Sequence, residues 1–579
     1  MKRLATLALV AASVFVSERS QAFCGFYVAP GDKPLYNDAT MVALLRDGTR
    51  TALSMSNNYR GPASDFAMVV PVPVVLQKEN VKVLAKSVFT RLEAISAPRL
   101  VEYWEQDPCH PYPPPMPMPS SAKMGGAGVE STTTKGPAKD YGVKIEAKFE
   151  VGEYQILVLS AKQSDGLESW LHDNKYNVPQ GASAALAPYV KEQWKFFVAK
   201  VDITKVALDT NGTAQLSPLR FHYESNDFRL PVRLGLLNAG STKQDLLLFV
   251  LSKTDRYEVA NYPNVFVPTN LEVTDATRTS FAPFYATLFD TAVEKAHGSG
   301  IVTEYSWTTP FFSNNGGMKC DPCPSQPITA PSDVAALGGD VLWGLGGAPA
   351  PVSKGPTWGG GGFGDLGNVV ITRMHARYDS KSLSDDLVFK TAPPVVGGRE
   401  TGGPKGNEQG AMPSSQNNFQ ARYVIRHPWT GPIQCKNPVR GVWGGPSGSW
   451  SKPPPPASAT SLASVSRTGI KLASFLKAGL PKFDVKAAGP TPPYVAPPQP
   501  PSPPDPVDAG AQADASVIDA AMPPPVSAIE PPSGANTGTS SVAPVPSVQP
   551  QPHGCGCSTP GGQASSWAGL GAIAALATL

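Results

Sequence analysis

Alternating apolar and polar positions predict several β-strands in the first 486 residues. Residues 143–150 alternate apolar and charged side chains with a period of two, which is typical of a strand with one solvent-facing side. Residues 219–224 alternate in the same way. The apolar runs at 154–159 and 245–251 are of the length and composition of buried strands.

Turn residues and prolines add a hairpin and a further strand. Two apolar runs within 42–54 flank Asp47-Gly48, a pair that accepts the positive φ angles of a tight hairpin turn. Residues 66–75 predict a strand at a sheet edge or bulge, because Pro71 and Pro73 lack amide donors.

Helical periodicity is confined to shorter segments. Apolar residues at spacings of three and four predict helices over 81–95 and 281–292. Because strands outnumber long helices, we predict an α+β fold with a mixed, largely antiparallel sheet and several packed helices.

Low-complexity segments divide the chain into parts. The 62 prolines are unevenly spread and predict one large soluble body at 23–486, with loop insertions near 111–139 and 344–366. Residues 487–553 are rich in Pro, Ala and Ser and predict a disordered stalk, because so few large apolar residues cannot offset chain entropy. Residues 554–579 form a short Cys-containing apolar segment.

The first 22 residues have the pattern of a secretory signal peptide. Lys2 and Arg3 precede an apolar stretch that is too short to span a bilayer, and Ser20 and Ala22 provide small residues for cleavage. We therefore expect an exported protein whose mature chain begins at Phe23.

Charge and motif content restrict the function. The net charge of +3 over 579 residues gives no electrostatic reason to expect nucleic acid as a partner. The chain contains no G-x-S-x-G, phosphate-binding loop or H-E-x-x-H pattern. The pattern favours a non-enzymatic protein without a cofactor, and it does not exclude an enzyme.

Export would place the cysteines in an oxidising compartment. Five cysteines fall in the predicted body and are candidates for disulfide or redox chemistry: Cys24, Cys109, Cys320, Cys323 and Cys435. Pairing Cys24 with Cys109 and Cys320 with Cys323 would leave Cys435 single, and other pairings are equally allowed.

The pair Cys320-Asp321-Pro322-Cys323 has the spacing of a redox disulfide. Prolines follow at once and no helix pattern begins there, so a structural disulfide is favoured over redox chemistry. A zinc site would need two further ligands, which Cys435 or a distant histidine could supply. Glu168 and His172 are spaced to share a metal on one helix, although an ordinary surface pair is favoured. The metal content is left open.

Two predicted strands carry cationic side chains that share one face on each strand: Arg373, His375 and Arg377 on the first, Arg422 and Arg426 on the second. If these strands were neighbours, they would form a basic patch able to bind carboxylated sugars, phosphates or lipid head groups. The favoured alternative is a solvated sheet face neutralised by nearby aspartates, namely Asp379, Asp385 and Asp386.

Several blocks give the body a resemblance to a known family. They are CGFY at 24–27, SAKQSDGLESWLHDNKYNVP and KFFVAKVD within 156–202, KCDPCP at 319–324, ITRMHARYD at 371–379, and YVIRHPWTGPIQC with RGVWGGP within 423–446. With these blocks in this order, the body resembles the bacterial domain-of-unknown-function family 2330. The resemblance implies an exported protein and assigns no activity or functional residue.

The last residues are similar to the sorting tags known as MYXO-CTERM. The matching features are Gly554-Cys555-Gly556-Cys557, a Pro-Gly-Gly spacer and the apolar run 567–579, whereas the terminal arginine cluster of such tags is missing. The resemblance implies delivery to the outer surface, with Cys555 or Cys557 as the point of lipid attachment. Membrane contact is expected only through this tag.

These features together predict an exported cell-envelope protein of the outer surface that works as a non-enzymatic binding or structural module. A surface glycan, a lipid head group or an envelope protein is the expected partner. The alternative is an envelope redox or metal-binding protein centred on Cys320 and Cys323.

Overall fold

The computed structural model describes residues 26–28, 36–60, 66–110, 142–174, 176, 178–206, 216–238, 243–310, 331–345, 368–379, 381–398, 408–444, 457–458, 465–480 and 482–490. The predicted signal peptide, the stalk beyond residue 490 and the sorting tag lie outside these residues, as do the 111–139 insertion and nearly all of the 344–366 insertion.

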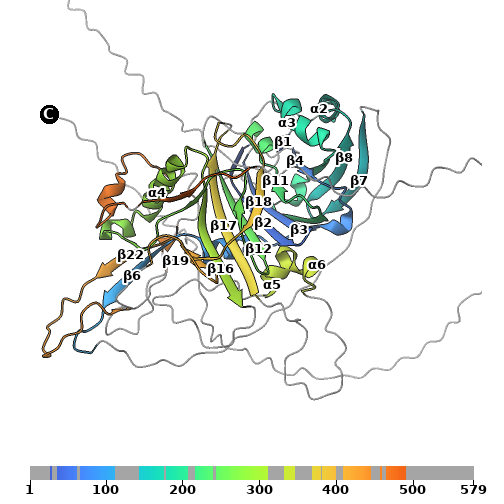
Figure 1. Ribbon diagram of the computed structural model, residues 1–579. Coiled ribbons are helices and arrows are strands. Elements are labelled where there is room, and N and C mark those ends of the chain that lie inside the picture. The colour runs from blue at the N-terminus through green and yellow to red at the C-terminus, as the bar shows by residue number, and fades with distance from the viewer. Residues whose placement is uncertain are drawn as a thin grey trace, which may run out of the picture. The chain divides into compact units, whose positions relative to one another are not determined.

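Five strands form an antiparallel sheet that is covered on one face by two helices (Figure 1). The strand order is β1 (Phe26–Val28), β4 (Phe66–Val72), β9 (Lys195–Val201), β8 (Tyr154–Ala161) and β7 (Val143–Val151). The covering helices are α2 (Ser164–Asp173) and α3 (Ala182–Lys191). Leu167 and Leu186 on the helices pack against Phe196 and Val198 of β9.

A larger mixed sheet forms the centre of the described structure. Its strand order is β20 (Met412–Pro413), β19 (Val395–Gly397), β21 (Asn418–Gln420), β16 (Ile301–Pro310), β17 (Asn368–Tyr378), β12 (Gln244–Ser252), β2 (Tyr36–Asp47), β3 (Arg50–Arg60), β10 (Leu219–Glu224) and β5 (Val81–Val83). Strand β14 (Asn264–Phe266) pairs with β16 and with β25 (Asp484–Lys486). The longest pairings are antiparallel, except that β12 runs parallel to β2.

Two smaller sheets complete the strand inventory of the described residues. One contains β11 (Arg229–Leu230), β18 (Leu387–Ala392) and β13 (Arg256–Val259). The other contains β15 (Leu271–Glu272), β22 (Arg422–His427), β6 (Arg99–Glu105) and β23 (Trp443–Gly444), and β24 (Ala457–Ser458) also pairs with β6. Residues 99–110 and 422–444, called the arm below, project from the body in Figure 1.

Period-two alternation places the two large sheets face to face. Leu246 and Leu248 of β12 share one core with Ile156 of β8 and Phe197 of β9. The intervening residues of β12, such as Phe249, face the helices on the opposite side. These helices are α1 (Ser87–Ser96), α4 (Phe281–Lys295), α5 (Pro331–Val334), a π-helical turn (Ala335–Gly339) and α6 (Asp340–Leu342). The remaining helical turns are of the 3₁₀ type: η1 (Lys78–Asn80), η2 (Ile203–Lys205), η3 (Arg233–Asn238), η4 (Asp275–Arg278) and η6 (Leu472–Phe475).

The predicted α+β class with a mixed, largely antiparallel sheet is confirmed. The helix predicted over 81–95 begins later, at Ser87, because Val81 and its neighbours pair with β10 as strand β5. Strand β4 has neighbours on both sides, yet β1 pairs only with residues 67–69, so Pro71 faces β9 alone. No helix within the described ranges is long and apolar enough to cross a membrane.

Candidate functional site

A disulfide joins the two segments of the arm. Cys109 follows β6, and Cys435 lies in the loop after β22; their Cα atoms are 5.6 Å apart and 326 residues separate them in sequence. The pairing of Cys24 with Cys109 is therefore wrong, because Cys109 already has a partner. Cys24, Cys320, Cys323, Cys555 and Cys557 lie outside the described residues, so the redox hypothesis stays a prediction.

The most deeply buried polar cluster lies between the large sheet and helices α1 and α4. Glu304 of β16 accepts hydrogen bonds from Arg373 Nε (2.6 Å) and Tyr285 Oη (2.7 Å). The His375 ring stands between two carboxylates, with Nδ1 3.0 Å from Glu304 Oε1 and Nε2 2.9 Å from Asp245 Oδ1. All of these side chains are at most 3% exposed, so the cluster belongs to the core.

Electrostatics holds this cluster in its charged form. Burial alone would raise the pKa of Glu304, but the charges of Arg373 and His375 outweigh it and lower the pKa to about 2. Burial alone would lower the pKa of His375, but Glu304 and Asp245 raise it to about 9. His375 is therefore an imidazolium at neutral pH, stacked on the Phe289 ring at 4.2 Å. A group with both nitrogens engaged in this way orders its neighbours and has no open position for a substrate.

The same cluster reaches the surface through Arg377, Asp290 and Arg467. Arg377 Nη1 lies 3.6 Å from Asp290 Oδ1, and Arg467 Nε lies 2.5 Å from Asp290 Oδ2. Burial raises the pKa of Asp290, and the Arg377 charge opposes this shift. These three side chains are 15–29% exposed, so this end of the cluster contacts solvent.

The predicted basic patch is not formed. Strands β17 and β22 belong to different sheets, and Arg373 and His375 are buried rather than solvated. Arg422 Nε is 3.1 Å from Asn270 Oδ1, and Arg426 Nη1 is 3.8 Å from Glu272 Oε2. The neutralising partners also differ from those expected. Charge on β17 is balanced by Glu304, Asp245 and Asp290, whereas Asp385 and Asp386 belong to another cluster and Asp379 bonds within its own turn.

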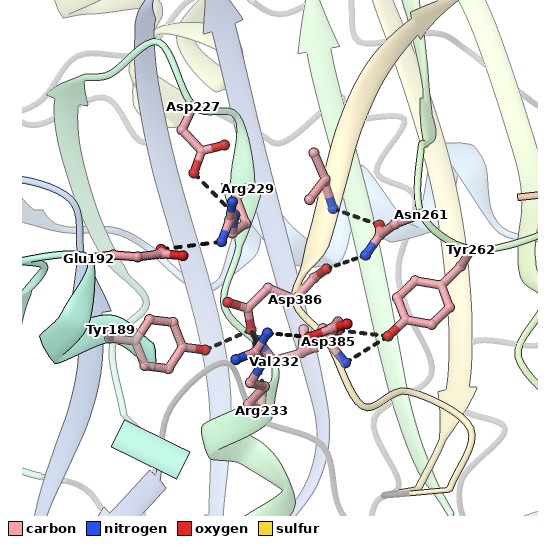
Figure 2. Close-up of polar contacts among 11 residues, drawn as sticks. Tyr189, Glu192, Asp227, Arg229, Val232, Arg233, Asn261, Tyr262, Asp385 and Asp386 are labelled. Atoms are coloured by element: carbon pink, nitrogen blue, oxygen red, sulfur yellow. Dashed lines mark hydrogen bonds and ion pairs between the residues drawn. The ribbon is translucent and has the colours of Figure 1, made fainter. Parts of the chain in front are cut away.

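Asp386 is the centre of a second buried cluster, shown in Figure 2. Its Oδ1 accepts hydrogen bonds from Tyr189 Oη of α3 (2.6 Å) and from the Val232 amide (3.0 Å). Arg233 forms ion pairs with Asp385 and Asp386. Asn261 donates to the Asp386 carbonyl at 2.8 Å. The cluster thus joins the helical layer over the five-stranded sheet to the β11–β18–β13 sheet.

This second cluster contains more acids than bases. Arg229 lies between Asp227 (3.1 Å) and Glu192 (3.4 Å). Burial raises the pKa of Asp227 to about 6 and also raises the pKa of Asp386. Acids with raised pKa values are typical of catalytic sites as well as of buried ion-pair networks. Here each such carboxylate is bonded to groups of its own chain, which favours the structural role.

A shallow cavity of about 560 Å³ lies elsewhere, at the end of α4 and along β25. Its lining is composed of lysines, apolar side chains and one aspartate: Lys295, Leu480, Lys482, Phe483, Asp484 and Val485. Within the described residues no group of three or more His, Cys, Asp or Glu side chains is arranged to hold a metal. Glu168 and His172 are 4.0 Å apart on α2, at the distance of an ordinary helix-surface pair.

Sequence reasoning missed Glu304 and Asp227, and it assigned Asp386 to the wrong partners. Glu304 is the single charge in the run IVTEYSWTT, and an isolated acid in a buried-type strand is a signal for a buried cationic partner. Asp386 and Asp227 lie in connecting segments that resemble ordinary polar loops, so they gave no comparable signal.

The fold defines a mixed-sheet α+β protein in which two buried clusters, around Glu304 and around Asp386, pair their charged groups with one another. The family described as "Uncharacterized protein conserved in bacteria" (DUF2330) matches residues 18–390. The chain belongs to this family. No match was found among curated proteins or among solved structures. The matched span ends before three features that are joined to residues inside it. Strand β22 pairs with β6, Cys435 is bonded to Cys109, and Arg467 forms an ion pair with Asp290.

Proposed function

We propose that this protein is exported and acts at the outer surface of the cell envelope as a non-enzymatic binding or structural module. The observation that carries this proposal is the Cys109–Cys435 bond. Structural disulfides form and persist in oxidising compartments and are rare in the reducing cytosol. The predicted signal peptide and sorting tag are consistent with the same location.

The surroundings of the disulfide support a structural purpose. The Glu105 carboxylate, at the end of β6, accepts hydrogen bonds from the Trp429 amide (2.9 Å) and the Gly441 amide (2.8 Å), and Arg440 pairs with it at 2.8 Å. The Val439 amide donates to the Pro108 carbonyl at 2.8 Å. A covalent bond among so many local contacts holds the arm in one shape, which is useful for contact with a partner.

The buried clusters favour binding or structure over catalysis. A general acid or base must reach a proton on its substrate. Glu304 and Asp386 are buried and are bonded to Arg373, Tyr189 and other groups of the chain. The cavity at the end of α4 has neither of these acids in its lining. The redox or metal alternative at Cys320 and Cys323 stays a prediction.

Cell fractionation combined with a disulfide map tests the proposal. The full chain is expressed with its signal peptide in a bacterium, envelope and cytosolic fractions are separated, and thiols are alkylated before any reduction. We expect envelope protein that begins at Phe23 and yields a Cys109–Cys435 cross-linked peptide. In the Cys435→Ser control, Cys109 should become alkylated. Recovery in the cytosol with both thiols alkylated would overturn the proposal.

A further inference from the structure

The chain has a long segment without acidic residues. Residues 409–483 contain no Asp or Glu, although the average of 46 acidic residues in 579 would place about six in a segment of this length. The same segment contains nine Lys and Arg residues. It includes one half of the arm and three of the six residues that line the cavity. Such one-sided charge is typical of a surface that contacts an anionic partner.

Part of this positive charge is left exposed. Arg440, Arg467 and Lys477 pair with Glu105, Asp290 and Glu272 of the preceding chain. For Lys436 in the arm and for Lys471 and Lys482, all exposed, the described part of the chain provides no ion-pair partner.

Exposed apolar side chains lie near these lysines in the sequence. Six large apolar residues of the described structure are prominently exposed, and five of them lie within or next to the acid-free segment: Met412 (43%), Ile433 (41%), Val439 (47%), Leu480 (37%) and Val485 (37%). Ile433 and Val439 flank the disulfide-bonded Cys435, so they are held on an ordered tip. Single exposed apolar residues are normal on a protein surface, but exposed apolar and cationic side chains concentrated in one segment indicate an interaction site.

The arm and residues 465–480 lie on the same side of the body (Figure 1). Lys477 connects them, because its Nζ lies 3.0 Å from Glu272 Oε1 and 3.5 Å from the Arg426 carbonyl at the base of the arm. Leu476 also forms a bridge with Val273 beside β22. These contacts hold residues 476–477 against the base of the arm, so the exposed lysines and aliphatic side chains are carried by two adjoining segments, which together form the cationic surface considered below.

We propose that this surface docks on an anionic lipid bilayer, with Ile433 and Val439 entering the interface and Lys436, Lys471 and Lys482 contacting head groups. Lysine suits this role because its aliphatic stem lies along apolar material while its ammonium group stays at the polar boundary. A hydrophilic polyanion such as an acidic glycan would use the lysines but would gain nothing from exposed Ile433 and Val439. The inference deepens the proposed envelope role by naming a surface and its partner.

Vesicle cosedimentation of the full chain tests the inference. Phosphatidylcholine vesicles containing phosphatidylglycerol are compared with vesicles of phosphatidylcholine alone. We expect binding to the anionic vesicles that weakens as salt rises, since exposed charges are screened. Ile433→Asp combined with Val439→Asp, and separately Lys436→Glu combined with Lys482→Glu, should each weaken binding about tenfold. The corresponding changes on β7, Ile145→Asp and Lys148→Glu, are matched controls because Ile145 is equally exposed (41%), and they should bind as the unaltered chain does.

Two results would overturn the inference. One is equal binding of the arm variants and the β7 controls, which would place any lipid contact elsewhere, for example in the apolar tail. The other is failure to bind anionic vesicles. If the chain then bound dextran sulfate in a salt-sensitive way, and the Ile433 and Val439 changes left that binding intact, the partner would be a hydrophilic polyanion. The export test can succeed while this one fails, so the two proposals are separable.

Discussion

Replacing Glu304 by glutamine tests whether the buried cluster is charged as described. The change keeps the size of the side chain and removes its charge. Arg373 would then lose its bonded carboxylate, His375 would keep only Asp245, and the Tyr285 hydroxyl would lose its anionic acceptor. Removal of one partner from a buried ion pair is strongly destabilising, because the remaining charge is left uncompensated in the core.

Two estimates of the cost agree. Lowering the pKa of Glu304 from 4.5 to about 2 corresponds to about 3 kcal/mol of preferential stabilisation of the carboxylate, at about 1.4 kcal/mol per pKa unit. Breaking a buried ion pair typically costs about 3–5 kcal/mol. We therefore expect Glu304→Gln to reduce the free energy of unfolding by about 3 kcal/mol near pH 6.

The pH dependence of the free energy of unfolding provides a second test of the charge assignment. The folded-state pKa of Glu304 is lowered, so its stabilisation is present above pH 4.5 and is lost as the pH falls towards 2. The pKa of His375 is raised, so its stabilisation is complete below pH 6.5 and is lost as the pH rises through about 9. In Glu304→Gln the contribution of Glu304 to the acidic loss should disappear. The alkaline loss should still begin near pH 6.5, but it should be smaller and should end at lower pH, because His375 retains only the Asp245 carboxylate and its folded-state pKa falls.

Urea denaturation monitored by tryptophan fluorescence from pH 3 to 9 measures both the loss of stability near pH 6 and the change in its pH dependence. Asp47→Asn is a suitable control, because Asp47 and Arg50 form a partly exposed pair at 2.8 Å on the β2–β3 hairpin. Its removal should cost about 1 kcal/mol or less. A Glu304→Gln protein as stable as this control at pH 6, with unchanged alkaline behaviour, would refute the charge assignment.

Two further changes test other parts of the structure. Replacing Cys109 and Cys435 together by serine removes a bond between residues separated by 326 positions in sequence, for which loop-closure entropy sets a ceiling of about 6 kcal/mol. In urea denaturation without reductant, the free energy of unfolding of this variant should be about 2–4 kcal/mol lower than that of the unaltered protein, which is the typical loss. An unchanged free energy of unfolding would contradict a disulfide in the folded chain. Burial raises the pKa of Asp227 from 3.8 to about 6, so its contribution favours folding below pH 3.8 and is lost as the pH rises through 6. Asp227→Asn should flatten the stability profile in that interval, and an unchanged slope would show that Asp227 is ionised throughout.

Strand periodicity predicted much of the fold because it depends on neighbours within one segment. The alternation at 219–224 and the apolar run at 245–251 correspond to β10 and β12. Helix α1 was predicted too long because the spacing of Val81 and Leu84 fits a helix, and only pairing with β10 makes residues 81–83 a strand. Strand β4 as a whole is not an edge strand, but Pro71 itself has a neighbour on one side only, because β1 pairs with residues 67–69 and does not reach it.

The buried clusters could not be predicted because their partners are far apart in the chain. The alternation of Arg373, His375 and Arg377 is visible in the sequence, and it suggested a solvated face. Their partners Glu304 and Asp245 lie 69 and 130 residues away from Arg373 and His375, respectively, on β16 and β12. Which side chains become neighbours depends on the order of the strands in the sheet, and the order β16–β17–β12 cannot be predicted from any local sequence pattern.

The parallel pairing of β6 with β22 has a consequence for the kinetics of folding. Residues 99–104 align with residues 422–427, so this ladder cannot form until more than four hundred residues are available. Contacts of such sequence separation form slowly, because the chain entropy of a very long loop is lost before the pairing compensates for it. Under the export proposed above, this delay would help to keep the chain unfolded until it has crossed the membrane. The Cys109–Cys435 bond would then close after β6 and β22 have met, covalently fixing a late step of folding.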